Sequence, residues 1–286
     1  MSTSFPLPLR APGTALLRSR PGLSLLVVAT FLVVNAIGLI PFRALAGDLV
    51  GWPRIAALAV LGYGLYLVAP MAVAWALRGR RGVLDALGLA GSPWTALAFT
   101  LACSAIVPIG YALGADLAAG DALALDLMRT AVLPGIAEEL LFRAFLFGFL
   151  YRYAGWGFLP AALLAALVFG VEHVYQGGDT GEALAIAALT GLGGLWWSWL
   201  LVEWRWNLWV PIGFHVLLNA YWTVFDMADD ALGGGWTVAL RGVCILLSIV
   251  GTLALARRRG GRQLTGARWW RGDDGTRRAP DAAPAH

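Results

Sequence analysis

Apolar residues fall in eight long blocks that short polar or charged stretches separate. The blocks lie near residues 22–40, 55–77, 94–113, 131–151, 156–175, 183–202, 206–225 and 236–256. Each holds about 20 residues, the length at which a helix crosses roughly 30 Å of hydrocarbon. The pattern therefore predicts an all-α fold, a polytopic transmembrane helix bundle of about eight spans.

The amino-acid composition also indicates a membrane protein. The chain has 286 residues, of which 59% are hydrophobic and 13% charged, with a mean hydropathy of +0.72. Soluble domains carry about 25% charged residues, so this composition excludes an ordinary soluble fold. The two cysteines, Cys103 and Cys244, both lie inside apolar blocks, so we expect neither a disulfide framework nor a cysteine zinc site.

Arginine placement predicts the topology. All basic residues are arginine, and they flank the apolar blocks in alternate loops, as Arg78, Arg80 and Arg81 do after the second block. The positive-inside rule then places both termini in the cytoplasm, although Arg43 and Arg54 lie in a loop predicted to be external. This distribution predicts no nucleic-acid partner, despite the net charge of +4. The arginine-only composition suggests a GC-rich genome and a bacterial cytoplasmic membrane.

The same reading divides the chain into five parts. They are a cytoplasmic N-terminal segment (1–20), N-terminal membrane helices (21–125), a core that carries the polar motifs (126–226), a last membrane helix (227–258) and a disordered cytoplasmic tail (259–286).

Ionisable residues interrupt the fourth block. A charge at the centre of a membrane helix costs about 2.5 to 3.5 kcal/mol on insertion scales, so such residues usually serve a function or a partner. Glu139 and Arg143 are four residues apart and can form an ion pair on one helix face. Glu138 projects about 100 degrees away from Glu139. It has no such partner, so it needs water or a donor, and a carboxylate in that position suits a general base.

Two later blocks carry histidines at helical spacing. Phe169 and His173 are four apart, as are His215 and Asn219, and the third histidine, His286, is the last residue. A lone histidine on an apolar helix is usually a packed core residue. Two histidines, an asparagine and an unpaired glutamate in three neighbouring segments favour a shared polar site instead.

Prolines stand near two of these residues. Pro134 and Pro211 each lie four residues before a candidate site residue, Glu138 and His215. A proline inside a helix kinks it and frees one backbone carbonyl, which in a bilayer needs a partner or a wet cavity. The freed carbonyls are expected on Thr130 and Asn207.

These motifs resemble the CAAX-protease and bacteriocin-processing family, also called the Abi family. Its signature is Glu-Glu-x-x-x-Arg, then Phe-x-x-x-His, then His-x-x-x-Asn, and all three elements occur here in order within residues 130–225. The resemblance implies hydrolysis of peptide bonds within or beside the membrane. The roles it implies are water activation by Glu138 and His173, oxyanion stabilisation by His215 and Asn219, and support of the site by Glu139, Arg143 and Phe169.

Several alternatives stay open at this stage. Glu138, His173 and His215 can together hold a divalent metal such as zinc, but the same groups can activate water without one, and metal-free catalysis is slightly favoured. A peptidase would act on a peptide or membrane-protein substrate in the lipid bilayer. A non-catalytic bacteriocin-immunity or assembly factor is a second reading. A proton-coupled transporter is a third, although we find no internal repeat.

Overall fold

The computed structural model describes residues 19–38, 47–117, 122–225 and 233–272. Within these ranges the chain is helical, and an isolated bridge between Trp156 and Arg271 is the one β-type pairing. The predicted all-α polytopic bundle is therefore confirmed. Most of the predicted N-terminal segment, the acidic stretch 226–230 and residues 273–286, including His286, lie outside the described residues.

The helices follow one another along the chain with short connections. They are α2 (Arg20–Gly38), α4 (Gly51–Leu61), α5 (Gly64–Arg78), η1 (Arg80–Gly82), α6 (Val83–Ala86), α7 (Pro93–Ser104), α8 (Ile106–Tyr111), α9 (Leu123–Leu127), η2 (Met128–Val132), α10 (Leu133–Glu138), η3 (Glu139–Phe147), α11 (Gly148–Arg152), α12 (Phe158–Val171), η4 (Val174–Gln176), α13 (Thr180–Glu203), α14 (Trp209–Val224), α15 (Gly234–Arg258) and η5 (Gly266–Trp269).

Six segments among the described residues are long and apolar enough to cross a membrane. They are Arg20–Ile37, Gly51–Arg78, Pro93–Tyr111, Phe158–Gln176, Thr180–Glu203 and Gly234–Arg258, and they match six of the eight predicted spans. The remaining two are the continuous helical segment 123–152, which carries the acidic pair and Arg143, and α14, which has 16 residues. The two predicted spans that do not meet this criterion of length and apolar composition both carry motif residues.

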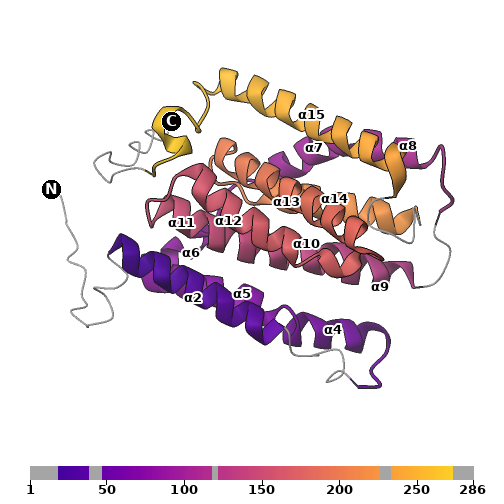
Figure 1. Ribbon diagram of the computed structural model, residues 1–286, viewed down its shortest axis with the longest axis horizontal. Coiled ribbons are helices and arrows are strands. Elements are labelled where there is room, and N and C mark those ends of the chain that lie inside the picture. The colour runs from indigo at the N-terminus through magenta and orange to yellow at the C-terminus, as the bar shows by residue number, and fades with distance from the viewer. Residues whose placement is uncertain (1–18, 39–46, 118–121, 226–232, 273–286) are drawn as a thin grey trace.

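The layering of the bundle explains how charged residues are accommodated. Helices α2, α4 and α5 form one side, α15 with α7 and α8 the opposite side, and the segment from α9 to α14 lies between them (Figure 1). Every residue of η3 is buried. The charged helix thus has protein around it rather than lipid, the arrangement in which intramembrane ionisable groups are tolerated.

Local sequence signals set the start and the packing of α13. The Asp179 side chain accepts the backbone N–H of Glu182 at 2.9 Å, and the Glu182 carboxylate accepts the N–H of Gly178 at 2.7 Å, a reciprocal cap. Further along, α12 packs tightly on α13, because a Cβ at Gly170 would overlap the backbone of Ala187. This close approach carries α12 and its motif residues against α13.

Pro211 lies in the first turn of a helix, not in the helix interior that the sequence predicts. Helix α14 begins at Trp209, so Pro211 belongs to the first turn, where a missing N–H breaks no helical hydrogen bond. The carbonyl of Asn207 instead accepts the N–H of Val210 at 3.2 Å. The expected kink before His215 is therefore replaced by an ordinary helix start.

Part of the predicted disordered tail packs against the bundle. Leu264 is fully buried, and the ring of Trp269 meets Phe158 edge-on with centroids 5.3 Å apart. The carboxylate of Glu203, at the end of α13, accepts the backbone N–H groups of Gln263 (3.0 Å) and Leu264 (3.2 Å). Disorder from residue 259 onward is thus the wrong description for residues up to 272, because two apolar anchors and one carboxylate hold them.

Glu203→Ala is expected to release this segment. Hydrogen bonds to a charged group contribute about 1.5 to 3 kcal/mol. Local opening should therefore rise about tenfold or more, since each 1.4 kcal/mol is tenfold. Limited trypsin digestion in detergent should show faster cleavage after Arg262, which is exposed. Glu182→Ala, at the other end of the same helix, is the control, and equal cleavage rates in the two variants would contradict the anchoring role.

Candidate functional site

The two adjacent glutamates lie at a change in helical winding. Glu138 ends the α-helical segment α10, and Glu139 begins η3, a π-helical stretch of nine residues. The residue spacing predicts a regular α-helix here, and this part of the prediction is wrong because the winding changes at Glu139. Inserted π turns occur often at functional sites, because they change the direction in which successive side chains point.

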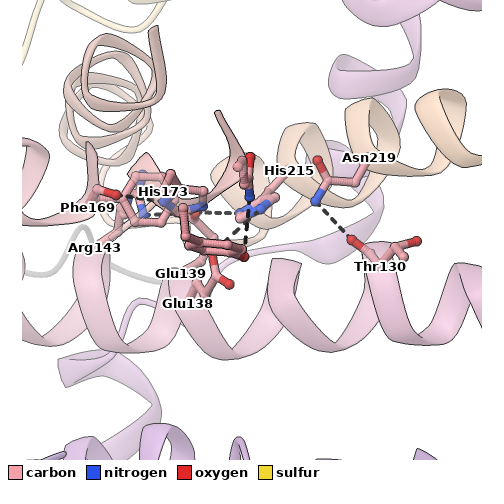
Figure 2. A network of polar contacts seen from close by, with 10 residues as sticks. Thr130, Glu138, Glu139, Arg143, Phe169, His173, His215 and Asn219 are labelled. Atoms are coloured by element: carbon pink, nitrogen blue, oxygen red, sulfur yellow. Dashed lines mark hydrogen bonds and ion pairs between the residues drawn. The ribbon is translucent and has the colours of Figure 1, made fainter. Parts of the chain in front are cut away.

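Glu139 is the centre of a buried charge network (Figure 2). Its Oε1 lies 3.3 Å from Nη1 of Arg143 and 2.8 Å from Nδ1 of His215, and the side chains of Glu139 and Arg143 are 0% and 1% exposed. The expected ion pair between Glu139 and Arg143 is therefore present. The contact with His215, which comes from a different helix, is not predicted by spacing within the fourth block.

Aromatic rings hold the guanidinium of Arg143. Its Cζ lies 3.8 Å from the ring centroid of Phe169 and 4.9 Å from that of Trp197. Neither Nη1 nor Nη2 has a hydrogen-bond partner among the described residues, so the rings and the Glu139 charge provide its surroundings. This cation–π contact gives Phe169 a physical role beside Arg143.

The guanidinium of Arg143 occupies the space that a side chain at position 194 would need. Alanine substitution is therefore expected to affect stability differently at Gly194 and at the neighbouring Gly193. A Cβ on Gly194 would come within 2.9 Å of Nη2 of Arg143, whereas a Cβ on Gly193 would meet nothing within 4 Å. Gly194→Ala should therefore destabilise the protein by about 1 to 3 kcal/mol, as overpacking does. Gly193→Ala should leave the thermal unfolding temperature in detergent unchanged or higher, and an equal loss in both variants would contradict this packing.

His215 is oriented by Glu139 and presents its other nitrogen to Glu138. Because an ionised carboxylate only accepts hydrogen bonds, the Glu139 contact assigns a proton to Nδ1 of His215. Nε2 then faces Oε2 of Glu138 at 3.9 Å, too far for a direct hydrogen bond. The indole of Trp197 stacks on the imidazole, with centroids 4.6 Å apart and planes 21° apart. The imidazole is thus held on one edge and one face.

Glu138 and Glu139 each have one buried oxygen beside this imidazole without a hydrogen-bond partner among the described residues, but only Glu139 uses its other oxygen to contact His215. In Glu138 this oxygen is Oε2, and the side chain as a whole is 17% exposed. A buried carboxylate oxygen without a donor is costly, so it marks a place where water or a substrate group can bind.

His173 lies at the end of α12 and shares the aromatic neighbour of Arg143. Its Nδ1 lies 2.7 Å from the backbone carbonyl oxygen of Phe169, which can only accept, so Nδ1 carries the proton and Nε2 is left as the acceptor. The Phe169 ring lies 4.6 Å from the His173 ring and 6.3 Å from the His215 ring, centroid to centroid. The two imidazoles therefore flank one phenyl ring.

Asn219 satisfies the carbonyl that Pro134 leaves open. Its amide Nδ2 donates to the backbone oxygen of Thr130 at 3.0 Å, one turn of α14 away from His215 (Figure 2). The position of Pro134 predicts that the Thr130 carbonyl needs such a partner, and this prediction is confirmed. An amide carries two N–H groups, so one remains for another acceptor.

A cavity of about 620 Å³ lies beside these residues, between α12, α13, α14 and α15. Phe169, His173, His215 and Asn219 line it, together with mainly apolar side chains. Glu138 is not among the described residues that line it, but its Oε2 lies 3.9 Å from Nε2 of His215, which does line it. The structure thus brings the candidate residues together and places Glu138 next to a lining residue rather than in the lining itself.

The donor geometry does not support a metal site. Among the described residues, no three carboxylate, imidazole or thiolate groups are placed to hold one ion together. His215 uses Nδ1 for Glu139 and His173 uses Nδ1 for a carbonyl, so each offers only Nε2. That leaves the one nitrogen that a metal ligand needs, but Glu138, His173 and His215 are not placed together as the three-ligand set that the sequence allows, and no chemical step is assigned to a metal.

Three further residues border the site without having been singled out from sequence. Trp197 contacts both Arg143 and His215, and nothing in the pattern of its apolar block marks it. Glu172 interacts electrostatically with Glu138, and Tyr66 of α5 interacts with both carboxylates. Glu172 could have been identified from the sequence, because an acidic residue inside an apolar block is rare.

Known proteins match the part of the chain that holds the site. Residues 120–221 match the family model described as "Type II CAAX prenyl endopeptidase Rce1-like". A stretch of 107 residues is 26% identical to the "Putative membrane peptidase YdiL" of Bacillus subtilis (strain 168), and covers 37% of this chain and 39% of that relative. The match thus spans about two fifths of the relative's length. No solved structure matches the chain.

Proposed function

Because the chain belongs to the CAAX-protease and bacteriocin-processing family through residues 120–221, we propose that it is an intramembrane endopeptidase that hydrolyses a peptide bond with an activated water molecule. The observation that carries this proposal is the unpartnered Oε2 of Glu138, 3.9 Å from Nε2 of His215. A base with a free oxygen next to an oriented imidazole suits water activation.

In the proposed reaction, water attacks the carbonyl carbon of the substrate. As the water oxygen bonds to the carbonyl carbon, Glu138 takes a proton from that water. Glu138 later delivers this proton to the amine nitrogen as the carbon–nitrogen bond breaks. His173 helps to position the water through Nε2, the acceptor that its carbonyl contact leaves available. Two roles are thus divided between a base and an orienting acceptor.

The negative charge that develops on the substrate oxygen needs donors. His215, held in place by the carboxylate of Glu139, is one proposed donor, through Nε2 when that nitrogen carries a proton. The second N–H of Asn219 is the other proposed donor, with the amide held in place by Thr130. Arg143 balances the charge of Glu139, so it supports the site without touching the substrate.

The proposal is tested by incubating the purified protein in detergent with a peptide library and identifying products by mass spectrometry. Wild type should cleave a subset of peptides that Glu138→Ala leaves intact. Asp126→Ala is the matched control, because Asp126 is a half-exposed carboxylate on the same helical segment. A parallel reaction with a metal chelator should proceed at the same rate. Cleavage by Glu138→Ala at the wild-type rate would refute the proposed base.

We propose further that both termini lie in the cytoplasm, because arginine-rich loops alternate with acidic ones. Reporter fusions after Arg81 and after Asp230 should then report opposite sides of the membrane, and a report from the same side would refute this topology. In this orientation the end of the cavity near Gln176 faces the external side.

A further inference from the structure

The cavity next to the two histidines has an apolar part and a polar part. Its volume of about 620 Å³ falls within the roughly 300 to 1,000 Å³ of typical ligand sites. Aliphatic side chains from α13, α14 and α15 and the rings of one phenylalanine and three tryptophans form the apolar part of the wall. Thr130, Gln176, Thr190, Asn219, Thr223 and Arg241 supply the polar groups of the lining, together with the two histidines. An occupant therefore has an apolar portion and a polar portion close to the reactive groups.

The rim of this cavity includes apolar side chains that are exposed on the surface of the bundle. Leu189 and Leu192 of α13 and Val238 of α15 line the cavity and are also 42%, 63% and 38% exposed. Exposed leucine and valine side chains on membrane helices face hydrocarbon chains rather than water. The cavity is thus accessible from the bilayer between α13 and α15.

Two glycines in the wall have no packing reason to be glycine. Gly193 of α13 and Gly242 of α15 both line the cavity, and a Cβ on either would meet no heavy atom within 4 Å. Glycine in a membrane helix usually allows a neighbour to approach closely, as Gly170 does for Ala187. A glycine that makes no such contact only weakens its helix. The open space beside Gly193 and Gly242 therefore needs an explanation.

We propose that Gly193 and Gly242 set substrate specificity: they make room for a large apolar side chain of a membrane-spanning peptide segment, which enters between α13 and α15 and lies next to the scissile bond. This inference rests on the proposed peptidase function and names its substrate class. An extended peptide has backbone N–H and C=O groups that must be satisfied inside the membrane. The polar residues of the cavity can form hydrogen bonds with these peptide groups. A lipid chain has no polar groups that could bind to the polar residues of the cavity.

The first test measures selectivity. Two peptides that wild type cleaves, differing only by alanine or phenylalanine at one position beside the cleaved bond, are compared by kcat/KM for wild type, Gly193→Phe and Gly242→Phe. A single methylene in an apolar pocket is worth about 10- to 200-fold. Wild type should prefer the phenylalanine peptide, and each variant should lose at least about tenfold of that preference while still cleaving the alanine peptide. Gly235→Phe is the control, because a Cβ there also meets nothing and Gly235 is not among the lining residues.

Thermal unfolding establishes that the variants are folded, and Gly193→Ala and Gly242→Ala provide a graded series if either phenylalanine variant is unstable. Unchanged selectivity in folded variants would overturn the inference and leave the proposed peptidase intact. Cleavage only of peptides that carry an attached lipid chain would overturn it as well, because the occupant would then be the lipid.

A second test does not depend on cleavage. An apolar membrane-spanning peptide with a photoreactive phenylalanine analogue is irradiated with Glu138→Gln protein in vesicles, and the labelled segments are identified by mass spectrometry. Label should appear on α13 and α15 near Leu192 and Val238, and Gly193→Phe should remove most of it. Label elsewhere, or label that Gly193→Phe does not reduce, would overturn the inference. A wild type that is labelled but never cleaves would instead refute the proposed function.

Discussion

Replacing Glu138 with glutamine is expected to leave the protein stable and to lower peptide cleavage by about 10²- to 10⁴-fold, the usual contribution of a general base. Glutamine keeps the shape of the side chain but cannot accept a proton at neutral pH. Oε2 of Glu138 has no hydrogen-bond partner among the described residues, so little native bonding is lost. Thermal unfolding in detergent and single-turnover cleavage of one substrate measure the two effects separately.

Asp126→Asn is the matched control for this variant, because Asp126 is partly exposed and belongs to the same helical segment. It should change neither the unfolding temperature nor the cleavage rate. Full activity of Glu138→Gln would remove Glu138 from the mechanism. Unfolding of Glu138→Gln alongside a stable Glu139→Ala would reverse the roles of the two glutamates.

Removing either partner of the buried ion pair should destabilise the protein by about 3 to 5 kcal/mol, because an uncompensated charge remains in a low-dielectric interior. Glu139→Ala strands Arg143, whose guanidinium has no hydrogen-bond partner in the described chain. It also removes the 2.8 Å contact that orients His215, so activity should fall with stability. Thermal unfolding in detergent and cleavage of one peptide report the two losses.

The exposed pair Asp126 and Arg129, on the same helical segment, is the control for this prediction. Its side chains are 43% and 50% exposed, so Arg129→Ala should cost at most about 1 kcal/mol. A double variant with Glu139→Gln and Arg143→Gln should recover most of the stability, because neither charge is then buried alone. Equal stability of Arg143→Ala and Arg129→Ala would show that the buried pair does not support the fold.

The sequence was sufficient for the fold class and for the candidate residues. Apolar blocks of membrane-spanning length and a low charged fraction predict a helical membrane bundle, because hydrocarbon excludes unpaired backbone groups. Helical spacing predicts the pair Glu139–Arg143, and the missing N–H of Pro134 predicts a partner for the Thr130 carbonyl. These are local consequences of covalent geometry, so the order of residues along one helix contains them.

Contacts between helices needed the tertiary structure. His215 meets Glu139 across 76 positions of sequence, and Trp197 stacks on His215 from a third helix. The π winding at Glu139 and the absence of Glu138 from the cavity lining are likewise seen only in the folded chain. Residue spacing specifies which side chains share a face of one helix, but the rotation and approach of neighbouring helices decide which faces meet. For that reason the candidate residues could be named from the sequence, while the contacts between helices on which their proposed roles rest arise only from the packed bundle.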